Sequence, residues 1–564
     1  MTPIPDTSAP ALDSAVSTVG EAASRWLALP VEEKADRLAE LRRRFAEVSA
    51  DIVAEGLAAK GLDERYAGEE WASGPLAVIR TIRFLEDSLR GIAASERVPI
   101  ADSNIRERPD GQVAVDVMPG DAWDRILYPR WRAEVRMERD IPLSEARAHL
   151  GGIHTKPEAG RPGVTAVLGA GNVSSITPLD VVHQLFVEGR TVVAKCHPMS
   201  EYIGPQLEDA FGALIDEGFL RFVYGGGEVG AAMIAHAGVD TVHLTGSERT
   251  FDAIVWGVGA EASERKSRQE PLVDKEMTAE LGNVSPVVVV PGQWSSEAIR
   301  RQAEHVATQL LHNAGHNCNA AEVLVLPAEW PQRDEFMEAL AAAVSSRPPR
   351  LAYYPGSDDR FDRIVGSGTR VQMFGERSLG VVPPAIVEGI DPSGDAAAFG
   401  EEAFCHVLAV TDLEGSDAAT YLGRAVDFCN DRLRGTLNAT ILVDPSTARS
   451  IGADLGRAVT ELRYGTVGVN VWAAASFPLG VTPWGAYPGH PPEDIQSGTG
   501  FVHNARLVDR PEKTVITAPF RQVPKPPWSL FHRRGGPALR EATMFEARPG
   551  SARLGRVLRY ALRP

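Results

Sequence analysis

Strand-like and helix-like segments alternate between Val164 and Thr245, and this alternation constrains the fold more than any other feature of the chain. Short apolar runs such as VTAVLG, TVVAK and FLRFVY are each followed by a longer helical pattern. Such repetition is typical of βαβ units, which build a mainly parallel sheet covered by helices. A second stretch of this kind begins at SPVVVV, continues through EAIRRQAEHVATQLLHNAG and ends at AEVLVL. The sequence therefore predicts an α/β protein with two parallel sheets.

The flanking segments carry other periodic patterns. Over residues 15–90 apolar side chains such as Leu38 and Leu41 recur at helical spacing, so we expect amphipathic helices that contribute packing rather than chemistry. Alternating patterns at 131–141 and again at 506–518 predict two strands that are far apart in sequence. We expect these two strands to pair and form a small bridging element.

The overall charge argues against a polyanionic partner. The 564 residues include 58 Lys and Arg against 75 Asp and Glu, a formal net charge of −17. An acidic surface repels nucleic acid, so we expect a small-molecule ligand. Four cysteines are too few for a disulfide framework in this length, and no apolar run reaches the ~20 residues of a membrane span. With no signal-peptide pattern and no zinc-ligand spacing, we expect a cytoplasmic protein without a metal site.

The composition changes after Phe520, where PKPPWSLFHRRGG favours an extended polyproline segment. Apolar residues from Leu554 to Leu562 then mark a short amphipathic helix with arginines on its other face. We expect this helix to dock onto its own protein, and contact with a membrane surface is the alternative. Because the motifs described below all precede residues 520–564, we expect this C-terminal extension to be dispensable for chemistry.

Two glycine-rich segments match nucleotide-binding patterns. GGGEVG, which begins at Gly225, fits GxGxxG after the strand-like FLRFVY, and GAGNVS nearly fits after VTAVLG. Glycines at such positions let the backbone approach a pyrophosphate closely, although glycines also end strands for purely structural reasons. Together the two segments support a nucleotide ligand without locating it.

Cys318 lies at the predicted turn between a helix and a buried strand, where Gly315 permits a tight backbone. The thiolate is the reactive form of cysteine, so a nucleophile at this turn needs a lowered pKa or a nearby base. An inert buried thiol is the alternative for any lone cysteine, and it is our interpretation of Cys196, Cys405 and Cys429.

The decisive signal is a set of dispersed motifs in an order that is hard to obtain by chance. The motifs are GAGNVSS with Asn172, TVVAKCHP with Lys195, LTGS with Gly246 and Ser247, ELGN with Glu280, HNAGHNC with Cys318, EEAF with Glu402 and Phe404, and finally YGTVGVN. With these motifs the chain resembles the NAD(P)-dependent aldehyde dehydrogenase superfamily over roughly residues 15–519. The resemblance selects Cys318 as the nucleophile among the four cysteines.

The resemblance implies that an aldehyde is oxidised to a carboxylic acid through a thiohemiacetal and a thioester on Cys318. It assigns the developing oxyanion to the Asn172 side-chain amide and the backbone N–H of Cys318. Hydride leaves to the nicotinamide, and Glu280 then activates the water that hydrolyses the thioester. A carboxylate ahead of an apolar strand is partly desolvated, which raises its pKa toward the range useful for proton transfer.

The resemblance also implies a cofactor, NAD or NADP, and a set of residues that contact it. They are Lys195 at the adenosine ribose, Gly246 and Ser247 at the pyrophosphate, Glu402 at the nicotinamide ribose, Phe404 beside the nicotinamide, and Gly225 in the glycine-rich turn. Backbone amides at a helix start suit a pyrophosphate, and carboxylates accept hydrogen bonds from ribose hydroxyls.

Several positions depart from the family pattern. Pro198 stands where the family has a glutamate that repels a 2′-phosphate, and His197 beside it could supply a proton, so we expect NADP to be accepted at least as well as NAD. The alternative is that Glu201 provides the missing carboxylate. Val181 replaces a family lysine, and PWGAYPGHPPED replaces the usual PFGGYKxSG, so the aldehyde is left unnamed.

We expect four parts along the chain: a cofactor domain over 1–281 with one bridging strand, a catalytic domain over 282–480, a return segment with the second bridging strand over 481–519, and the extension over 520–564. In the family such bridging hairpins build dimers or tetramers, and unpaired edge strands favour a homo-oligomer. A CoA-acylating dehydrogenase or acyl-CoA reductase is one alternative, against which Glu280 argues because thiolysis needs no base for water. A catalytically silent structural homologue is the other.

Overall fold

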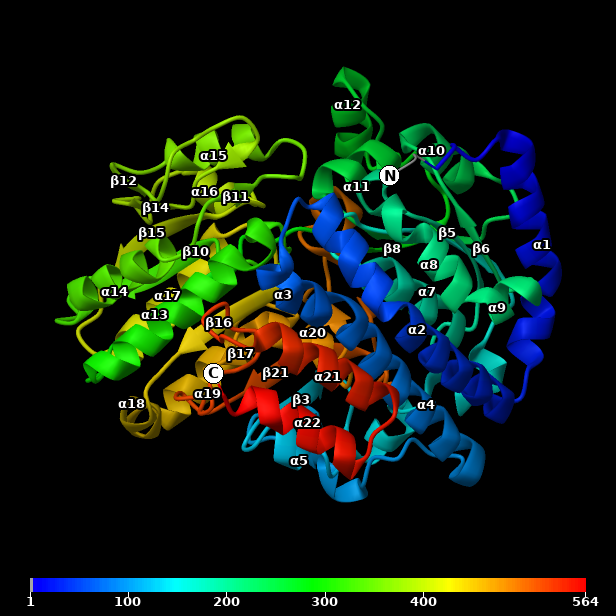
Figure 1. Cartoon of the computed structure of the whole chain (residues 1–564), viewed down its shortest axis with the longest axis horizontal. Helices are drawn as coiled ribbons and strands as arrows, with labels where there is room; N and C mark the ends of the chain where they lie inside the picture. Colours follow the sequence, from blue (N-terminus) through cyan, green and yellow to red (C-terminus); the bar gives the residue numbers. More distant parts are fainter. Residues whose placement is uncertain (1–3, 564) are drawn as a thin grey trace.

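Two β-sheets with helices packed around them form the frame of the molecule in this computed structural model, which describes residues 4–563 (Figure 1). The smaller sheet has six strands in the order β19-β8-β7-β4-β5-β6. The larger sheet has eleven strands in the order β1-β2-β3-β21-β17-β16-β9-β10-β15-β14-β12. Most neighbouring strands in the two sheets run parallel, so the α/β prediction is confirmed. No helix within residues 4–563 is long and apolar enough to cross a membrane.

The six-stranded sheet is built from the alternating segments that the sequence predicts. Its strands are β4 (Val164–Leu168), β5 (Thr191–Lys195), β6 (Leu220–Val223), β7 (Thr241–Thr245), β8 (Glu276–Glu280) and the short antiparallel β19 (Gly498–Thr499). Its helices include α7 (Ile176–Phe186), α8 (Gly204–Ala210), α9 (Gly212–Asp216), α10 (Gly227–Ala235), α11 (Glu248–Val255) and α12 (Ala260–Arg268). Because every residue of β4 and β5 is buried, the continuous apolar runs are explained by helices on both faces of the sheet.

The chain crosses to the larger sheet between Glu280 and Pro286. The strands of the larger sheet are β1 (Ile105–Glu107), β2 (Val113–Met118), β3 (Arg132–Met137), β9 (Pro286–Val289), β10 (Val323–Pro327), β12 (Arg370–Met373), β14 (Ala385–Glu388), β15 (Val407–Leu413), β16 (Asn438–Leu442), β17 (Thr466–Val469) and β21 (Pro511–Thr517). Its main helices are α13 (Ser296–Leu311), α14 (Arg333–Ser345), α15 (Ser357–Val365), α17 (Ala418–Arg432) and α19 (Gly452–Glu461). The carboxyl ends of β4, β5 and β7 and the start of β10 enclose the site described below.

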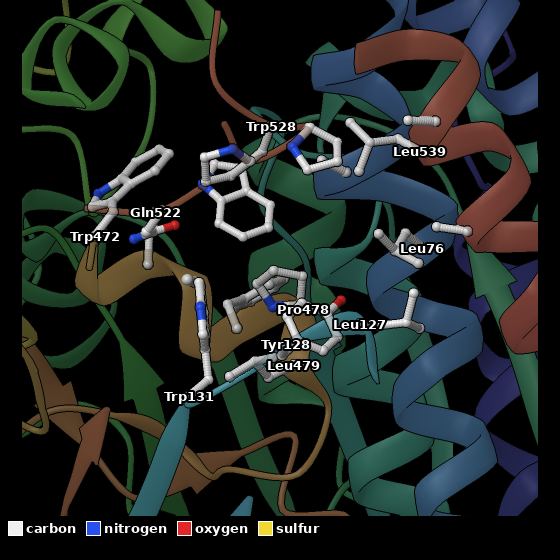
Figure 2. A pocket seen from close by; sticks show the side chains of 18 of the residues that line it. Leu76, Leu127, Tyr128, Trp131, Trp472, Pro478, Leu479, Gln522, Trp528 and Leu539 are labelled. Carbon is white, nitrogen blue, oxygen red and sulfur yellow. The ribbon is translucent and has the colours of Figure 1, made fainter. Parts of the chain in front are cut away.

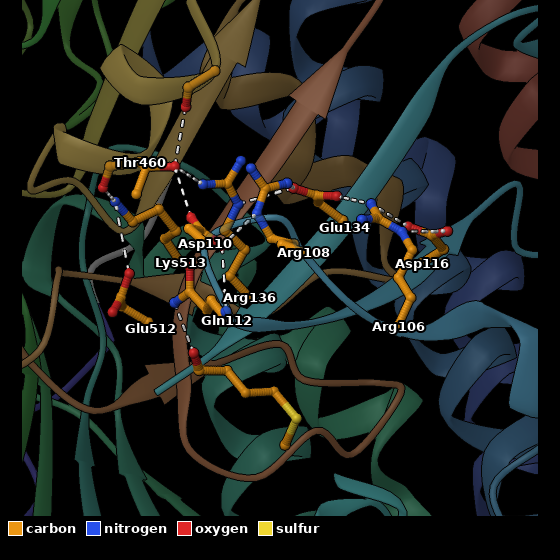
Figure 3. Close-up of polar contacts among 12 residues, drawn as sticks. Arg106, Arg108, Asp110, Gln112, Asp116, Glu134, Arg136, Thr460, Glu512 and Lys513 are labelled. Atoms are coloured by element: carbon orange, nitrogen blue, oxygen red, sulfur yellow. Dashed lines mark hydrogen bonds and ion pairs between the residues drawn. The ribbon is translucent and has the colours of Figure 1, made fainter. Parts of the chain in front are cut away.

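The two distant bridging strands pair as expected. Strand β3 runs antiparallel to β21, with Thr514 opposite Val135, and β21 in turn runs parallel to β17. Figure 3 shows polar side chains that fasten these strands to α19. The Lys513 ammonium on β21 donates hydrogen bonds to the carbonyls of Thr460 and Leu462 at 2.8 and 2.6 Å, and Arg136 on β3 donates to the Thr460 hydroxyl at 3.0 Å.

The pairing of β21 affects the argument that unpaired edge strands favour a homo-oligomer. Strand β21 has partners on both sides within its own chain, so it presents no unpaired edge to a second copy. Short β1 and exposed β12 lie at the two ends of the large sheet. The expected homo-oligomer is not tested by the fold, but the edge-strand reason for it no longer applies to the bridging strands.

The N-terminal region is helical, as the spacing of its apolar residues predicts. Its long helices are α1 (Ala9–Ala28), α2 (Val31–Ala59) and α4 (Ala77–Ser95), with the short α3 (Ala67–Trp71) between the last two. On α2, Leu38, Leu41 and Phe45 are buried, whereas the charged residues between them face outward.

The C-terminal extension folds back onto these N-terminal helices. It contains two helices, α21 (Gly535–Ala547) and the predicted amphipathic helix, α22 (Ser551–Ala561). Helix α21 packs against α3 and α4, and in Figure 1 the red extension lies beside the blue N-terminal helices. Leu554 and Val557 of α22 are buried against Phe545 of α21. The helix therefore docks onto its own protein, as expected.

Candidate active site

Cys318 lies where two cavities meet. A wide polar groove of about 1710 Å³ crosses the carboxyl edge of the six-stranded sheet. A second cavity of about 330 Å³ leads away from it toward the C-terminal extension. Asn172, Glu280 and Cys318 line both cavities, so the structure brings together the three residues that the sequence selects for chemistry.

An unusual backbone turn carries Cys318. Helix α13 ends at Leu311, and Asn313, Ala314 and Gly315 then follow with φ of 55°, 55° and 76°, in the left-handed region. A Cβ on Gly315 would meet the backbone carbonyl carbon of Cys405 at 2.4 Å. Only glycine fits this close approach, which confirms that Gly315 permits a tight backbone.

The segments around the turn hold the Cys318 backbone in place. Its carbonyl oxygen accepts hydrogen bonds from the Ser285 hydroxyl at 3.3 Å and from the Asn438 side-chain amide at 3.4 Å. The Asn283 amide donates to Ser285 at 2.9 Å and to the Asn438 carbonyl at 2.9 Å. These three polar residues precede or begin buried strands, and the sequence alone did not indicate a role for them.

Glu280, the predicted base, lies beside the thiol of Cys318, the predicted nucleophile. It ends strand β8, is buried, and interacts with the Cys318 thiol. Burial raises the pKa of Glu280 to about 7, with a further contribution from the negative charge of Asp180. Burial and the neighbouring Glu280 raise the pKa of the Cys318 thiol well above its usual range. The thiol therefore relies on an adjacent base rather than on a lowered pKa.

Asn172 sits in the turn between β4 and α7 and is fixed at both ends. Its side-chain amide donates to the His316 carbonyl at 3.0 Å, which leaves a second N–H on the same nitrogen. Its own carbonyl accepts from the Asn313 amide at 3.0 Å and from the Tyr353 hydroxyl at 3.1 Å. The oxyanion candidate is thus tied to the loop that carries Cys318.

Charged residues of the N-terminal helices also reach this loop, which sequence reasoning missed. Lys60 is buried, pairs with Glu70 at 2.7 Å and donates to the Asn313 side-chain oxygen at 3.0 Å. Glu69 accepts a hydrogen bond from the Asn313 backbone N–H and pairs with Arg350 at 3.0 Å. Residues 15–90 thus contact the loop that carries Cys318, and the expectation that they contribute packing rather than chemistry stays a prediction.

The polar groove contains the first group of predicted cofactor residues. Lys195, at the end of β5, lines it, as do Gly246 and Ser247 at the start of α11. The Ser247 hydroxyl accepts a hydrogen bond from the Thr250 N–H at 3.1 Å, which caps the helix. Gly225 does not line the groove, because its N–H points to the Glu201 carboxylate at 2.8 Å.

Gly226 and Gly227, rather than Gly225, line the groove at the start of α10. A Cβ on either of them would meet no atom within 4 Å. The glycine-rich turn is therefore open at the groove, which suits a bulky anionic group near backbone amides.

Glu402 and Phe404 also line the groove. Glu402 accepts a hydrogen bond from the Asn283 N–H at 3.2 Å, and burial raises the pKa of Glu402 to about 8. The buried Glu322, which sequence reasoning missed, accepts hydrogen bonds from the N–H groups of Ala403 and Phe404 at 3.0 Å each. A carboxylate directly ahead of the apolar run VLVL is the signal that could have identified Glu322.

The segment around Pro198 is expected to favour NADP, with His197 near the phosphate and Glu201 as the alternative carboxylate. His197 and Pro198 line the groove, but burial and the nearby Lys195 lower the pKa of His197 to about 4. His197 is mainly neutral near pH 7, and its Nδ1 accepts from the Met199 N–H at 3.1 Å, so its ring proton is on Nε2 and its role as a proton donor to a phosphate stays a prediction. Glu201 is absent from the groove lining within the described residues, and its carboxylate accepts a hydrogen bond from the Gly225 N–H at 2.8 Å.

Comparison with known proteins agrees with this arrangement. The aldehyde dehydrogenase family model matches residues 141–350, which include Asn172, Glu280 and Cys318. N-succinylglutamate 5-semialdehyde dehydrogenase 1 of Caulobacter vibrioides is 27% identical over 388 residues, or 64% of this chain and 75% of that protein. The corresponding enzyme of Sphingopyxis alaskensis is 28% identical over 290 residues, and the match spans 51% of this chain and only about half, 54%, of that relative.

Solved structures share the fold. Glyceraldehyde-3-phosphate dehydrogenase GapN from Methanocaldococcus jannaschii, complexed with NADP, has a TM-score of 0.60 at 15% identity, covering 91% of this chain and 96% of that one. Lactaldehyde dehydrogenase from Escherichia coli has a TM-score of 0.59 at 18% identity, covering 90% and 91%. Residues 141–350 therefore match the aldehyde dehydrogenase family, and the chain shares its fold with solved aldehyde dehydrogenases.

Proposed function

We propose that this protein oxidises an aldehyde to a carboxylic acid with NAD or NADP, through a covalent thioester on Cys318. The observation that carries the proposal is the meeting of two cavities at Cys318, with Glu280 and Asn172 in both linings. One cavity has the size and polar residues for a dinucleotide, and the other opens on the opposite side for the aldehyde. The match of residues 141–350 to the aldehyde dehydrogenase family model supports the same reaction class.

The chain's own residues supply each proton and charge that the reaction needs. Glu280 takes the proton of the Cys318 thiol as sulfur attacks the aldehyde carbon, so that the carbonyl π electrons move to oxygen. The free N–H of the Asn172 amide and the backbone N–H of Cys318 stabilise the resulting alkoxide. When the thiohemiacetal collapses to a thioester, a hydride leaves the carbon. After the proton taken from the thiol has passed to solvent, Glu280 removes a proton from water as the water oxygen attacks the thioester carbon. The carbon–sulfur bond then breaks, the acid is released, and the Cys318 thiolate takes the proton back from Glu280.

The residues of the polar groove fit a dinucleotide. The open glycines at 226 and 227 and the N-terminus of α11 suit the pyrophosphate, Lys195 suits the adenosine ribose, and Glu402 suits the nicotinamide ribose. Bound NAD or NADP supplies the hydride acceptor. Phe404, held by Glu322 through its N–H, shields the groove wall next to Cys318.

The proposal is tested by replacing the nucleophile. We expect Cys318→Ala to abolish aldehyde-dependent formation of reduced cofactor while cofactor binding, followed by fluorescence, survives. The control is Cys405→Ala, because Cys405 is buried and lines neither cavity. Turnover by Cys318→Ala would remove the central claim.

Acyl transfer to CoA is distinguished from hydrolysis by the product that forms. Measurement of the acid or the acyl-CoA product with and without CoA distinguishes the two, and the buried Glu280 beside Cys318 supports hydrolysis. A catalytically silent homologue is distinguished by intact-mass detection of an acyl adduct on the wild-type enzyme.

A further inference from the structure

The smaller cavity has an apolar wall built from several separate segments of the chain. Its inner end is Cys318 with Glu280 and Asn172, and its volume of about 330 Å³ lies at the lower end of the range for small-molecule sites. Figure 2 shows its side chains arranged around a central space. The labelled side chains are Leu76, Leu127, Tyr128, Trp131, Trp472, Pro478, Leu479, Gln522, Trp528 and Leu539.

We propose that this cavity is the aldehyde tunnel, and that the C-terminal extension makes it selective for aldehydes with a long aliphatic chain. The inference rests on the proposed aldehyde oxidation and adds the substrate class to it. Residues 519 and 521–528 and both helices of the extension contribute to the lining. The expectation that the extension is dispensable for chemistry stays a prediction, and the inference adds a role in substrate selection.

The charged side chains of the wall offer little to a charged substrate. Lys525 is paired with Glu304 at 2.6 Å, and Arg521 is paired with Glu297 at 2.8 Å. Arg130 is exposed at the outer end. A substrate that carries carboxylates, such as the N-succinylglutamate semialdehyde named for the Caulobacter relative, would lose hydration here without gaining a buried cation. An aliphatic chain gains from the same transfer.

Buried ion pairs fix the extension as a permanent wall. Glu546 on α21 is 2% exposed and pairs with Arg80 at 2.5 Å and with Arg83 at 2.6 Å. Arg80 is fully buried and also pairs with Asp124 at 2.7 Å. Breaking such a cluster leaves uncompensated charges in the interior, so α21 is held firmly against α4.

Aromatic and backbone contacts hold the rest of the extension against the body of the protein. The Trp528 ring meets Trp131 edge to face at 5.4 Å, and both rings line the cavity. A Cβ on Gly68 would approach the Gly536 nitrogen at 3.1 Å, so α3 and the start of α21 are in close backbone contact. The extension is therefore closely packed against the rest of the protein where it forms the cavity wall.

The outer end of the cavity is apolar and open to water. Ile126, Val523 and Leu562 belong to its lining and are 50%, 67% and 58% exposed. The lining thus runs from the nucleophile to the protein surface along apolar side chains. Such a path is suited to a chain that extends well beyond its aldehyde group.

The first test is a series of straight-chain aldehydes from propanal to dodecanal. Each buried methylene should raise kcat/KM by about fourfold until the chain reaches the mouth, given about 0.8 kcal/mol per methylene. A profile that is flat or falls with chain length would overturn the inference, while oxidation of propanal would still support the proposed function. If no aldehyde of any length is oxidised, the proposed function fails as well.

The second test uses matched variants on α22. Leu558→Glu adds a carboxylate to the tunnel wall, whereas Ala552→Glu adds the same charge at an exposed position outside the lining. We expect the ratio of kcat/KM for dodecanal to that for propanal to fall at least about tenfold in Leu558→Glu and to stay within about twofold in Ala552→Glu. Equal ratios in both variants, with unchanged thermal unfolding, would show that the extension does not contact the substrate.

Discussion

Glu280 makes the sharpest prediction, because the structure gives it both a position and a titration range. Its pKa is raised to about 7, mainly by burial, and the groups that interact with it are Asp180, His243, Trp484 and the Cys318 thiol. A base acts only when deprotonated. About a tenth of this carboxyl group is ionised at pH 6 and about nine tenths at pH 8, so the base-dependent rate should rise about tenfold between these values.

The substitution Glu280→Gln removes the base and keeps the shape of the side chain. We expect steady-state turnover to fall by about 10²–10⁴ and the rise between pH 6 and pH 8 to disappear. The single-turnover burst of reduced cofactor, measured by stopped-flow absorbance, should also slow, because the raised pKa of Cys318 leaves the thiol dependent on Glu280.

The matched control is Glu276→Gln, at the exposed start of the same strand β8, which should leave both the rate and the pH profile unchanged. Normal deacylation in Glu280→Gln, or a wild-type rate that is independent of pH between 6 and 8, would refute the role of Glu280.

Three further outcomes are expected. Glu546→Ala should lower the free energy of unfolding by about 3–5 kcal/mol, seen as a lower Tm. Glu541→Ala on the same helix removes only an exposed ion pair and should have little effect. Similar losses of stability in the two variants would contradict the argument from the buried cluster. NADP should be used at least as well as NAD, and Pro198→Glu should shift kcat/KM toward NAD; a strong NAD preference that Pro198→Glu leaves unchanged would exclude this segment from cofactor choice. Light scattering should give a multiple of 60.7 kDa, as expected for a homo-oligomer, with the interface away from β21, which is paired on both sides within its chain; a mass near 60.7 kDa would contradict the oligomer.

Local patterns predicted the parts of the fold that depend on neighbouring residues. Buried strands β4 and β5 are continuous apolar runs, and α2 repeats its apolar residues at helical spacing, so each element can be derived from its own segment. The order of the motifs predicted the site as well. It selected Asn172, Glu280 and Cys318 from segments that are far apart in sequence, and all three lie where the two cavities meet.

Contacts between distant segments escaped prediction because no local pattern records them. Lys60 reaches Asn313 across 253 positions, and Arg80 reaches Glu546 across 466. A lysine or a glutamate in a helix is usually solvated, so a buried pair cannot be inferred from either member alone. The proline-rich, basic composition after Phe520 likewise indicates an appendage, and only the folded structure places it on the cavity wall.

The N-terminal helices connect these two missed features. Helix α2 leads into Lys60, which holds the nucleophile loop through Asn313, and α4 carries Arg80, which holds α21 through Glu546. Leu76, between these two sets of charges, lines the proposed tunnel. Because both ion pairs are buried, moving α2 relative to α3, or α4 relative to α21, would separate charges that have no access to water. The same helical segment therefore contacts both the loop that carries Cys318 and the wall of the proposed tunnel.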